Sequence, residues 1–142
     1  MRPAVFDASV AVKIFLPVEG SAKAEAAARQ YAMVSPELVL VETTNAFWKY
    51  VRKGMASRND CLTAVKNLSG FAELKPDRTL YPDALELAAE LDHPVYDCIY
   101  LALAGREKLP ILSADKRMLD HARDLGLEAI DLADIEAEVP AP

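Results

Sequence analysis

The chain has 142 residues, of which 52% are hydrophobic and 27% are charged, and this composition excludes a disordered or fibrous protein. Its net charge of −6 gives no overall attraction to nucleic acid, and its two cysteines exclude a disulfide framework. No apolar run is long enough to span a membrane, and the first apolar stretch is interrupted by charges, so we expect no signal peptide. We therefore expect one cytoplasmic domain over residues 1–142, with a core at about 3–132 and a frayed tail at 136–142.

The predicted elements alternate between strands and helices along the chain. Short apolar runs predict strands at residues 4–7, 32–34, 71–74, 110–113 and 127–130. Helix-forming residues and stop signals predict helices at residues 9–15, 21–31, 36–53, 58–68, 78–91, 95–108 and 115–125. We expect helix caps at Ser9, Ser35 and either Ser57 or Asn59. Strands joined by helical crossovers form a mostly parallel sheet covered on both faces, so the predicted fold is α/β.

Four acidic residues stand next to apolar segments. Asp7 ends the first strand, Asp115 follows the fourth, and Glu42 and Asp97 lie near the starts of two helices. In parallel sheets, ligands bind at the carboxyl ends of the strands where the strand order reverses. A carboxylate in apolar surroundings must be paired, neutralised or bound to metal. Because His93 is the only basic side chain within four residues of Asp7, Glu42 or Asp97, the four acids are a candidate site for Mg²⁺ or Mn²⁺.

Each acid also has a purely structural interpretation. Asp7, Asp97 and Asp115 can serve only as N-caps or first-turn acids of their helices. Glu42 can face solvent on an amphipathic helix. The site is absent only if all four acids are purely structural. All four, however, fall on one side of a single predicted sheet, which is the arrangement that a shared site requires. The pattern therefore carries more information than any one residue.

Basic residues gather in two stretches despite the negative net charge. The stretches contain Lys49, Arg52, Lys53 and Arg58, and then Lys116 and Arg117. These side chains form a solvated helix surface or, because bound divalent ions would invert the local potential, they contact a nucleic acid. The histidines are expected to be structural or exposed, and the two cysteines lack the pair spacing of a zinc site.

The segments around the four acids occur in a characteristic order. They are residues 6–9, 41–45, 96–104 and 113–117. Their order and spacing resemble the PIN domain family, and most closely the VapC-type toxins of bacterial toxin–antitoxin pairs, over residues 5–132. The resemblance implies a three-layer α/β/α fold around a parallel sheet of about five strands in the order 3-2-1-4-5. It also implies a Mg²⁺- or Mn²⁺-dependent endoribonuclease whose acidic quartet is Asp7, Glu42, Asp97 and Asp115.

The resemblance implies supporting residues and partners as well. Ser9, Asn45 and Ser113 match polar positions that support the site, although the two serines serve equally well as caps. The implied partners are RNA, a small cognate antitoxin and a second copy of the chain, with no membrane. The candidate RNA-binding residues are Lys49, Arg52, Lys53, Lys116 and Arg117. The aromatic residues that either line a partner surface or belong to the core are Phe47, Trp48 and Tyr50.

Two other functions compete with the endoribonuclease. Receiver domains and aspartyl-phosphate phosphatases also place acids at strand ends, but the phosphatase motif needs an acid where this chain has Ser9. A receiver needs adjacent acids near the first strand, where this chain has Asp7 alone. A non-catalytic PIN-like binding module would share the fold, but it has no physical reason to keep four costly acids together. A metal-dependent endoribonuclease is therefore the function we expect.

Overall fold

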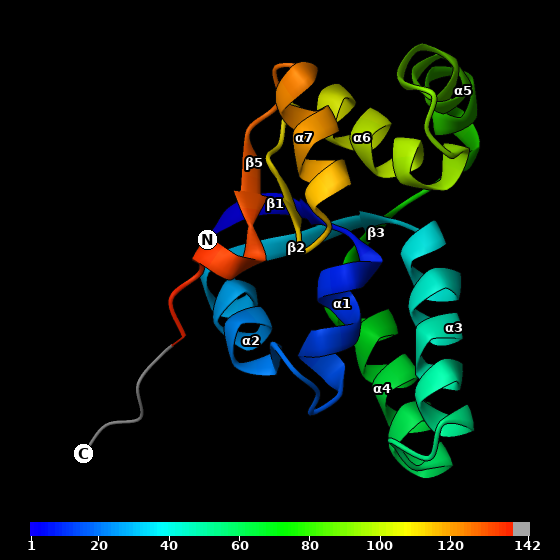
Figure 1. The fold of residues 1–142 in the computed structure, drawn as a ribbon, viewed down its shortest axis with the longest axis vertical. Coiled ribbons are helices and arrows are strands. Elements are labelled where there is room, and N and C mark those ends of the chain that lie inside the picture. The colour runs from blue at the N-terminus through cyan, green and yellow to red at the C-terminus, as the bar shows by residue number, and fades with distance from the viewer. Residues whose placement is uncertain (138–142) are drawn as a thin grey trace.

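A five-stranded sheet with helices on both faces forms the molecule in the computed structural model, which describes residues 1–137 (Figure 1). The strands are β1 (Arg2–Phe6), β2 (Tyr31–Pro36), β3 (Glu73–Lys75), β4 (Ile111–Ser113) and β5 (Ala129–Asp131). All pairings are parallel, and the strand order is β3-β2-β1-β4-β5. The predicted α/β fold and the predicted order 3-2-1-4-5 are both confirmed.

Seven α-helices and two short 3-10 turns connect the strands of the described part. The helices are α1 (Ala8–Phe15), α2 (Ser21–Gln30), α3 (Leu38–Arg52), α4 (Arg58–Phe71), α5 (Tyr81–Leu91), α6 (Val95–Glu107) and α7 (Lys116–Asp124), and the turns are η1 (Arg78–Leu80) and η2 (Leu132–Asp134). Helices α1 to α4 cover one face of the sheet, and α5 to α7 cover the other (Figure 1). Right-handed crossovers require this division, because the chain moves outward from β1 to β3 and then crosses back to β4 and β5. None of the helices within residues 1–137 is long and apolar enough to cross a membrane.

The core lies on both faces of the central strands. Val5 and Phe6 of β1 and Ile111 and Leu112 of β4 are fully buried. Helix α6 packs on β1, β2 and β4, and every residue at 98–104 is buried. Because a short connection joins the end of α6 to the start of β4, the first turn of α6 lies at the opposite, carboxyl edge of the sheet. The packing of α6 therefore brings its first turn to the edge where β1 and β4 end.

Two helix starts differ from the predicted ones. Helix α1 begins at Ala8 with Asp7 in the N-cap position, so Ser9 lies inside the first turn and does not cap the helix. Strand β2 continues through Pro36 because its end pairs with β3, so α3 begins only at Leu38 and Ser35 is not its cap. Instead, the buried Ser35 hydroxyl donates to the carbonyl of Phe6 at 2.6 Å. Long-range strand pairing thus overrides the local N-cap and proline signals.

The other boundaries move by a few residues. Ser57 caps α4 by accepting from the Asp60 N–H at 3.0 Å, as one of the two predicted caps. Because α4 continues through Phe71, β3 begins two residues later than predicted, and β5 is likewise shifted towards the C-terminus. Residues 136 and 137 of the predicted tail are exposed, and residues 138–142 lie outside the described residues.

Candidate active site

The carboxyl ends of β1 and β4 lie side by side at the point where the strand order reverses. Phe6 pairs with Leu112, so the residues that follow, Asp7 and Ser113, are also neighbours. The Ser113 hydroxyl donates to Asp7 Oδ2, and both side chains are buried, with Asp7 only 4% exposed. The chain therefore places a nearly inaccessible carboxylate at the position where ligands bind in sheets of this type.

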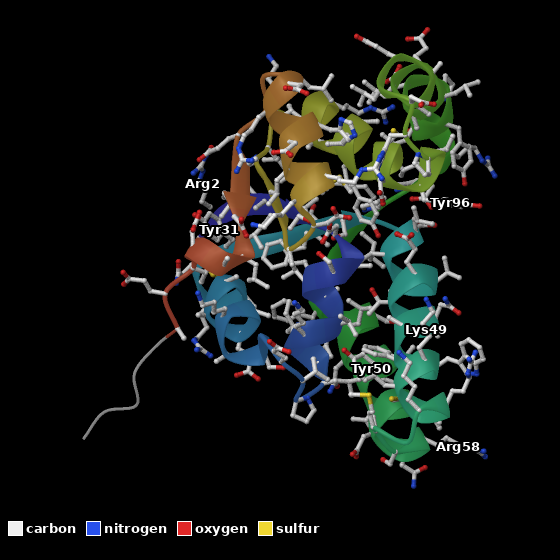
Figure 2. The ribbon with its side chains drawn as sticks, viewed as in Figure 1. Arg2, Tyr31, Lys49, Tyr50, Arg58 and Tyr96 are labelled. Carbon is white, nitrogen blue, oxygen red and sulfur yellow. The ribbon has the colours of Figure 1, made fainter. Side chains whose placement is uncertain are left out.

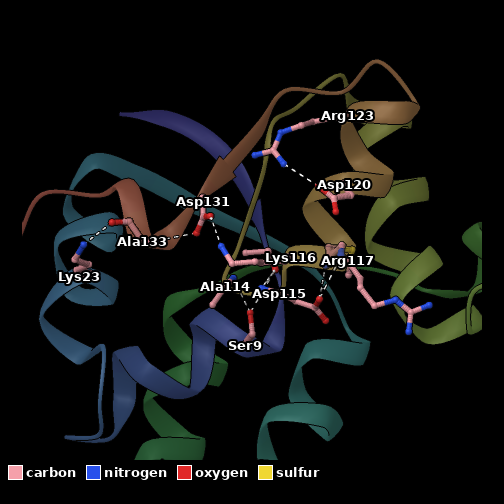
Figure 3. A network of polar contacts seen from close by, with 12 residues as sticks. Ser9, Lys23, Ala114, Asp115, Lys116, Arg117, Asp120, Arg123, Asp131 and Ala133 are labelled. Carbon is pink, nitrogen blue, oxygen red and sulfur yellow. Dashed lines mark hydrogen bonds and ion pairs between the residues drawn. The ribbon is translucent and has the colours of Figure 1, made fainter.

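Two serine hydroxyls hold the Asp7 carboxylate. Ser9 Oγ donates to Asp7 Oδ1 at 2.5 Å and accepts from the backbone N–H of Ala114 at 2.9 Å, a contact seen in Figure 3. Ser113 Oγ, which donates to the other carboxylate oxygen, accepts from the backbone N–H of Asp115 at 2.9 Å. Ser9 and Ser113 therefore tie the end of β1 to the turn between β4 and α7. Both serines, which the resemblance suggested as supporting residues of the site, lie against Asp7.

The surroundings of Asp7 disfavour its charged form. Burial raises the pKa of Asp7 to about 6, while the hydrogen bonds from Ser113 and Ser9 lower it and the negative charge of Asp97 raises it further. Hydroxyl donors satisfy the carboxylate oxygens, but they add no positive charge. A cation beside Asp7 would relieve both the desolvation of the carboxylate and its repulsion by Asp97.

Glu42 is held by a tyrosine that sequence analysis missed. The Tyr100 hydroxyl donates to Glu42 Oε1 at 2.7 Å, and the Tyr100 side chain is buried. Burial raises the pKa of Glu42, the Tyr100 hydrogen bond lowers it, and the charge of Asp97 raises it again. Burial and the Glu42 carboxylate both raise the pKa of Tyr100, so this phenol stays a donor. Tyr100 follows Asp97 by three residues on α6, and this same-face spacing is the signal that could have identified it.

Asp97 is held by a histidine. His93 Nε2 lies 2.7 Å from Asp97 Oδ2, and the His93 side chain is only 4% exposed against 30% for Asp97. An ionised carboxylate only accepts, so Nε2 is the donor. The His93 ring also makes an edge contact with His121, with ring centroids 4.6 Å apart. His93 is therefore structural, but it contacts a candidate metal ligand. Its spacing of four residues from Asp97 is the sequence signal for this contact.

Asp115 occupies a different environment from the other three acids. It is exposed, and its Oδ1 caps α7 by accepting from the backbone N–H groups of Arg117 at 2.9 Å and Met118 at 3.3 Å (Figure 3). Its structural interpretation as an N-cap therefore holds. Its connection to the buried acid runs through its own backbone N–H, which donates to Ser113 Oγ.

The acidic side chains of the described residues are near enough to influence one another, but they do not form a complete metal-binding site. Asp7, Glu42 and Asp97 interact electrostatically, since Asp97 raises the pKa of both Asp7 and Glu42. Within residues 1–137, however, no three His, Cys, Asp or Glu side chains stand close enough together to enclose a metal ion. The donor set itself suits a hard divalent cation, because it consists of carboxylate oxygens that repel one another. Asn45 is exposed and makes no hydrogen bond to these acids in the described structure.

The basic residues that sequence analysis selected are all exposed or at the edge of the acidic cluster. Lys116 Nζ pairs with Asp131 at 3.6 Å, and Arg117 is exposed at the start of α7. Lys49 and Lys53 are exposed on α3 and just after it. These basic side chains therefore do not neutralise the acidic quartet, and they belong to a different surface of the protein.

An apolar cavity of about 440 Å³ lies between α3 and α4. Phe47 is 1% exposed and belongs to the core, which is the structural alternative for this residue. Trp48 is 51% exposed, lines the cavity, and has the Arg52 guanidinium 5.3 Å from its ring. This arrangement leaves Trp48 as the aromatic residue of α3 with the largest accessible surface for a partner.

The chain is similar to known proteins over most of its length. The sequence model of the PIN domain family matches residues 4–124. Ribonuclease VapC3 of Pyrobaculum aerophilum is 28% identical over 120 residues, which cover 82% of this chain and 92% of that protein.

Solved structures share the same architecture. A crystal structure of a protein from Pyrobaculum aerophilum superposes with a TM-score of 0.71 at 21% identity, covering 96% of this chain and 91% of that one. A toxin–antitoxin complex from Klebsiella pneumoniae contains a chain that superposes with a TM-score of 0.64 at 16% identity, covering 82% of this chain and 89% of that one. At these identities the structural matches show a shared fold.

Proposed function

We propose that this chain, which belongs to the PIN domain family, is a divalent-metal-dependent endoribonuclease and the toxin of a VapB/VapC-type toxin–antitoxin pair. The observation that carries the proposal is the buried Asp7 carboxylate at the switch point of the sheet, which is repelled by the charge of Asp97 and accepts hydrogen bonds from the hydroxyls of Ser9 and Ser113. The similarity to a protein named a ribonuclease supports RNA as the substrate. In this function residues 1–142 act as one domain in the cytoplasm.

The acidic quartet is the proposed site of Mg²⁺ or Mn²⁺. Asp7, Glu42 and Asp97 would hold the ion, and the exposed Asp115 at the rim would complete the set. When bound, such an ion supplies a water of lowered pKa and offsets negative charge on the phosphate oxygens. This role requires no basic side chain as the proton acceptor.

The remaining polar residues of the site position the carboxylates. Ser9 and Ser113 fix both oxygens of Asp7, so the carboxylate cannot rotate away from the site. Tyr100 orients Glu42 and His93 orients Asp97, each at 2.7 Å. Hydrogen bonds that hold ligand side chains in place reduce the reorganisation needed when the ion and the phosphate bind.

The proposed partners follow from the same family relationship. A small antitoxin is supported by the similarity to a chain of a toxin–antitoxin complex, and the apolar cavity beside Trp48 offers a surface for it. A homodimer is part of the proposal as well. The aspartyl-phosphate alternative is disfavoured because Asp7 is 4% exposed and both its oxygens are hydrogen-bonded.

Cleavage of a labelled RNA panel tests the proposed function. We expect the purified protein to cut at least one structured RNA in Mg²⁺ or Mn²⁺ and to cut none in EDTA, because the acids alone cannot activate water. Electrophoresis of end-labelled products over time measures this. Cleavage that persists in EDTA would contradict metal dependence. A protein that binds neither RNA nor divalent ions would instead be the non-catalytic binding module.

A further inference from the structure

A cavity of about 480 Å³ lies beside the acidic cluster and is lined by lysines from three helices. Lys13 comes from α1, Lys23 from α2 and Lys116 from α7. The cavity reaches Ala114, whose N–H donates to Ser9 Oγ, and Ser9 in turn donates to Asp7. Figure 3 shows the Ser9–Ala114 contact beside a separate row of contacts that joins Lys116 to Asp131, Asp131 to Ala133 and Ala133 to Lys23. The lysine-lined cavity therefore opens next to the candidate active site.

A second cavity, of about 310 Å³, continues the first one along α3. It is lined by Lys49 and Lys53, and Tyr50 lines both cavities. Figure 2 shows Lys49 and Tyr50 as neighbours on α3, with Tyr50 on the side towards α1. We call the two cavities together the lysine groove. Because Tyr50 is half-buried, it offers a fixed aromatic surface in the middle of the groove.

The lysine groove is positive although the chain as a whole is negative. Five lysines line it, against two carboxylates, Glu19 and Asp131. Asp131 is already engaged, since it pairs with Lys116 at 3.6 Å and accepts from the Ala133 N–H at 2.9 Å. The net charge of the chain is −6, so the positive surplus in the groove is a local feature. A groove of this sign attracts polyanions, among them the phosphate backbone of a nucleic acid.

Gly20 makes room for one of these lysines. It has a φ of +88°, and a Cβ at this position would lie 3.1 Å from Lys13 Cδ and 3.3 Å from Lys13 Nζ. The left-handed conformation already favours glycine, and the missing side chain leaves the space in which the Lys13 ammonium group lies. The turn between α1 and α2 is thus shaped around a cation that lines the groove.

We propose that the lysine groove binds the backbone of single-stranded RNA on one side of the scissile phosphate, with Tyr50 stacking on a base. The inference rests on the proposed ribonuclease function and adds the path of the substrate. A positive groove that follows the backbone, combined with an aromatic surface, is the usual way in which proteins bind single strands without sequence preference. Such contacts position the strand, and sequence choice must come from elsewhere.

The proposal divides the basic residues that the sequence suggested. Lys49, Lys53 and Lys116 line the lysine groove, whereas Arg52 lines the apolar cavity and lies over Trp48. Lys13 and Lys23 join the set although they belong to no basic cluster in the sequence.

Binding of a fluorescein-labelled, mixed-sequence 12-nucleotide RNA tests the groove. Anisotropy in EDTA, over a range of salt concentrations, compares the wild type with the triple variant Lys13→Gln/Lys23→Gln/Lys116→Gln. We expect the variant to bind about tenfold more weakly or worse, and its salt slope to fall by about 2, since each phosphate contact on a single strand contributes about 0.7. The Lys→Arg triple variant at the same positions keeps the charge and should bind as the wild type does.

A matched control separates the groove from net charge. The variant Lys66→Gln/Lys75→Gln/Lys108→Gln removes the same charge from residues that line neither cavity, and it should bind within about twofold of the wild type. Equal losses of RNA affinity in the two glutamine variants would overturn the groove as an RNA-binding surface. Unchanged RNA affinity in the Lys13/Lys23/Lys116 variant would overturn it as well and would point to a protein partner at this surface. Circular dichroism checks that the variants are folded. The single variant Lys13→Gln should still lower the salt slope of RNA binding by about 0.7.

The cleavage assay keeps the two proposals apart. If the wild type cuts RNA in Mg²⁺ but the groove variant binds RNA unchanged, the groove is wrong and the ribonuclease stands. If the groove variant loses RNA binding while the wild type cuts nothing, the groove stands as an RNA-binding surface and the ribonuclease is wrong. If the wild type binds no RNA, both are wrong.

Discussion

Asp7→Asn is expected to lower the rate of RNA cleavage at least about a thousandfold, which corresponds to roughly 4 kcal/mol of transition-state stabilisation. Asn has the size of Asp and can still hydrogen-bond to Ser9 and Ser113, so the fold should be retained. What it lacks is the negative charge that would hold a divalent ion at the carboxyl end of β1. The effect should therefore appear in kcat without loss of the folded protein.

The effect is measured as the single-turnover rate of cleavage of one RNA that the wild type cuts, with wild type and variant at equal concentration. Asp124→Asn is the matched control, because Asp124 is an exposed acid at the opposite end of α7 from Asp115. It should cut at the wild-type rate. Cleavage by Asp7→Asn within tenfold of the wild type would remove Asp7 from the site.

The same substitution is expected to stabilise the metal-free protein at neutral pH. The pKa of Asp7 is about 6 in the folded chain and 3.8 in the reference state, so the folded state binds the proton more tightly than the unfolded state. The stability associated with this raised pKa is fully present below pH 3.8 and is lost as the pH rises through about 6. The difference between the two pKa values corresponds to on the order of 3 kcal/mol.

Urea unfolding in EDTA at pH 4.5 and pH 7.5 checks this prediction. Asn is neutral at both pH values, so the difference between variant and wild type isolates Asp7. At pH 4.5 the variant should be more stable than the wild type by only about 1 kcal/mol, and at pH 7.5 by on the order of 3 kcal/mol. A wild type that is equally or more stable than Asp7→Asn at pH 7.5 would show that the carboxylate is not destabilised in the folded protein.

The stability prediction and the activity prediction share one physical cause. A carboxylate that costs stability in the free protein is one that a cation can stabilise on binding. Addition of Mg²⁺ at pH 7.5 should therefore narrow the stability gap between wild type and Asp7→Asn. Active-site groups often lower the stability of the free protein in this way, because the environment that suits a bound ligand disfavours the group when it is alone.

The sequence predicted those parts of the site that depend on position along one strand. Asp7 was selected because it ends an apolar run, and strand ends meet at one edge of a parallel sheet, whereas Ser113 was selected through the family resemblance. Tyr100 was missed, although its spacing of three residues from Asp97 on α6 was visible. His93 was noted near Asp97 but was expected only to be structural or exposed, and its contact with the Asp97 carboxylate was not predicted.

Other features depend on tertiary packing and could not be read locally. Lys13, Lys23 and Tyr50 come from three different helices and meet only because α1 packs against both α2 and α3. The extension of β2 through Pro36 likewise depends on its pairing with β3. In each case the deciding contact is remote in sequence, so periodicity and caps carry no information about it.

Binding of Mn²⁺ to the purified, metal-free protein tests the central claim most directly, since the claim is that these carboxylates hold a divalent ion. Calorimetric titration at pH 7.5 compares wild type, Asp7→Asn and the control Asp124→Asn. We predict that wild type and Asp124→Asn bind Mn²⁺ with the same affinity and that Asp7→Asn binds at least about tenfold more weakly. A wild type without Mn²⁺ binding, or an Asp7→Asn variant that binds it unchanged, would contradict the account.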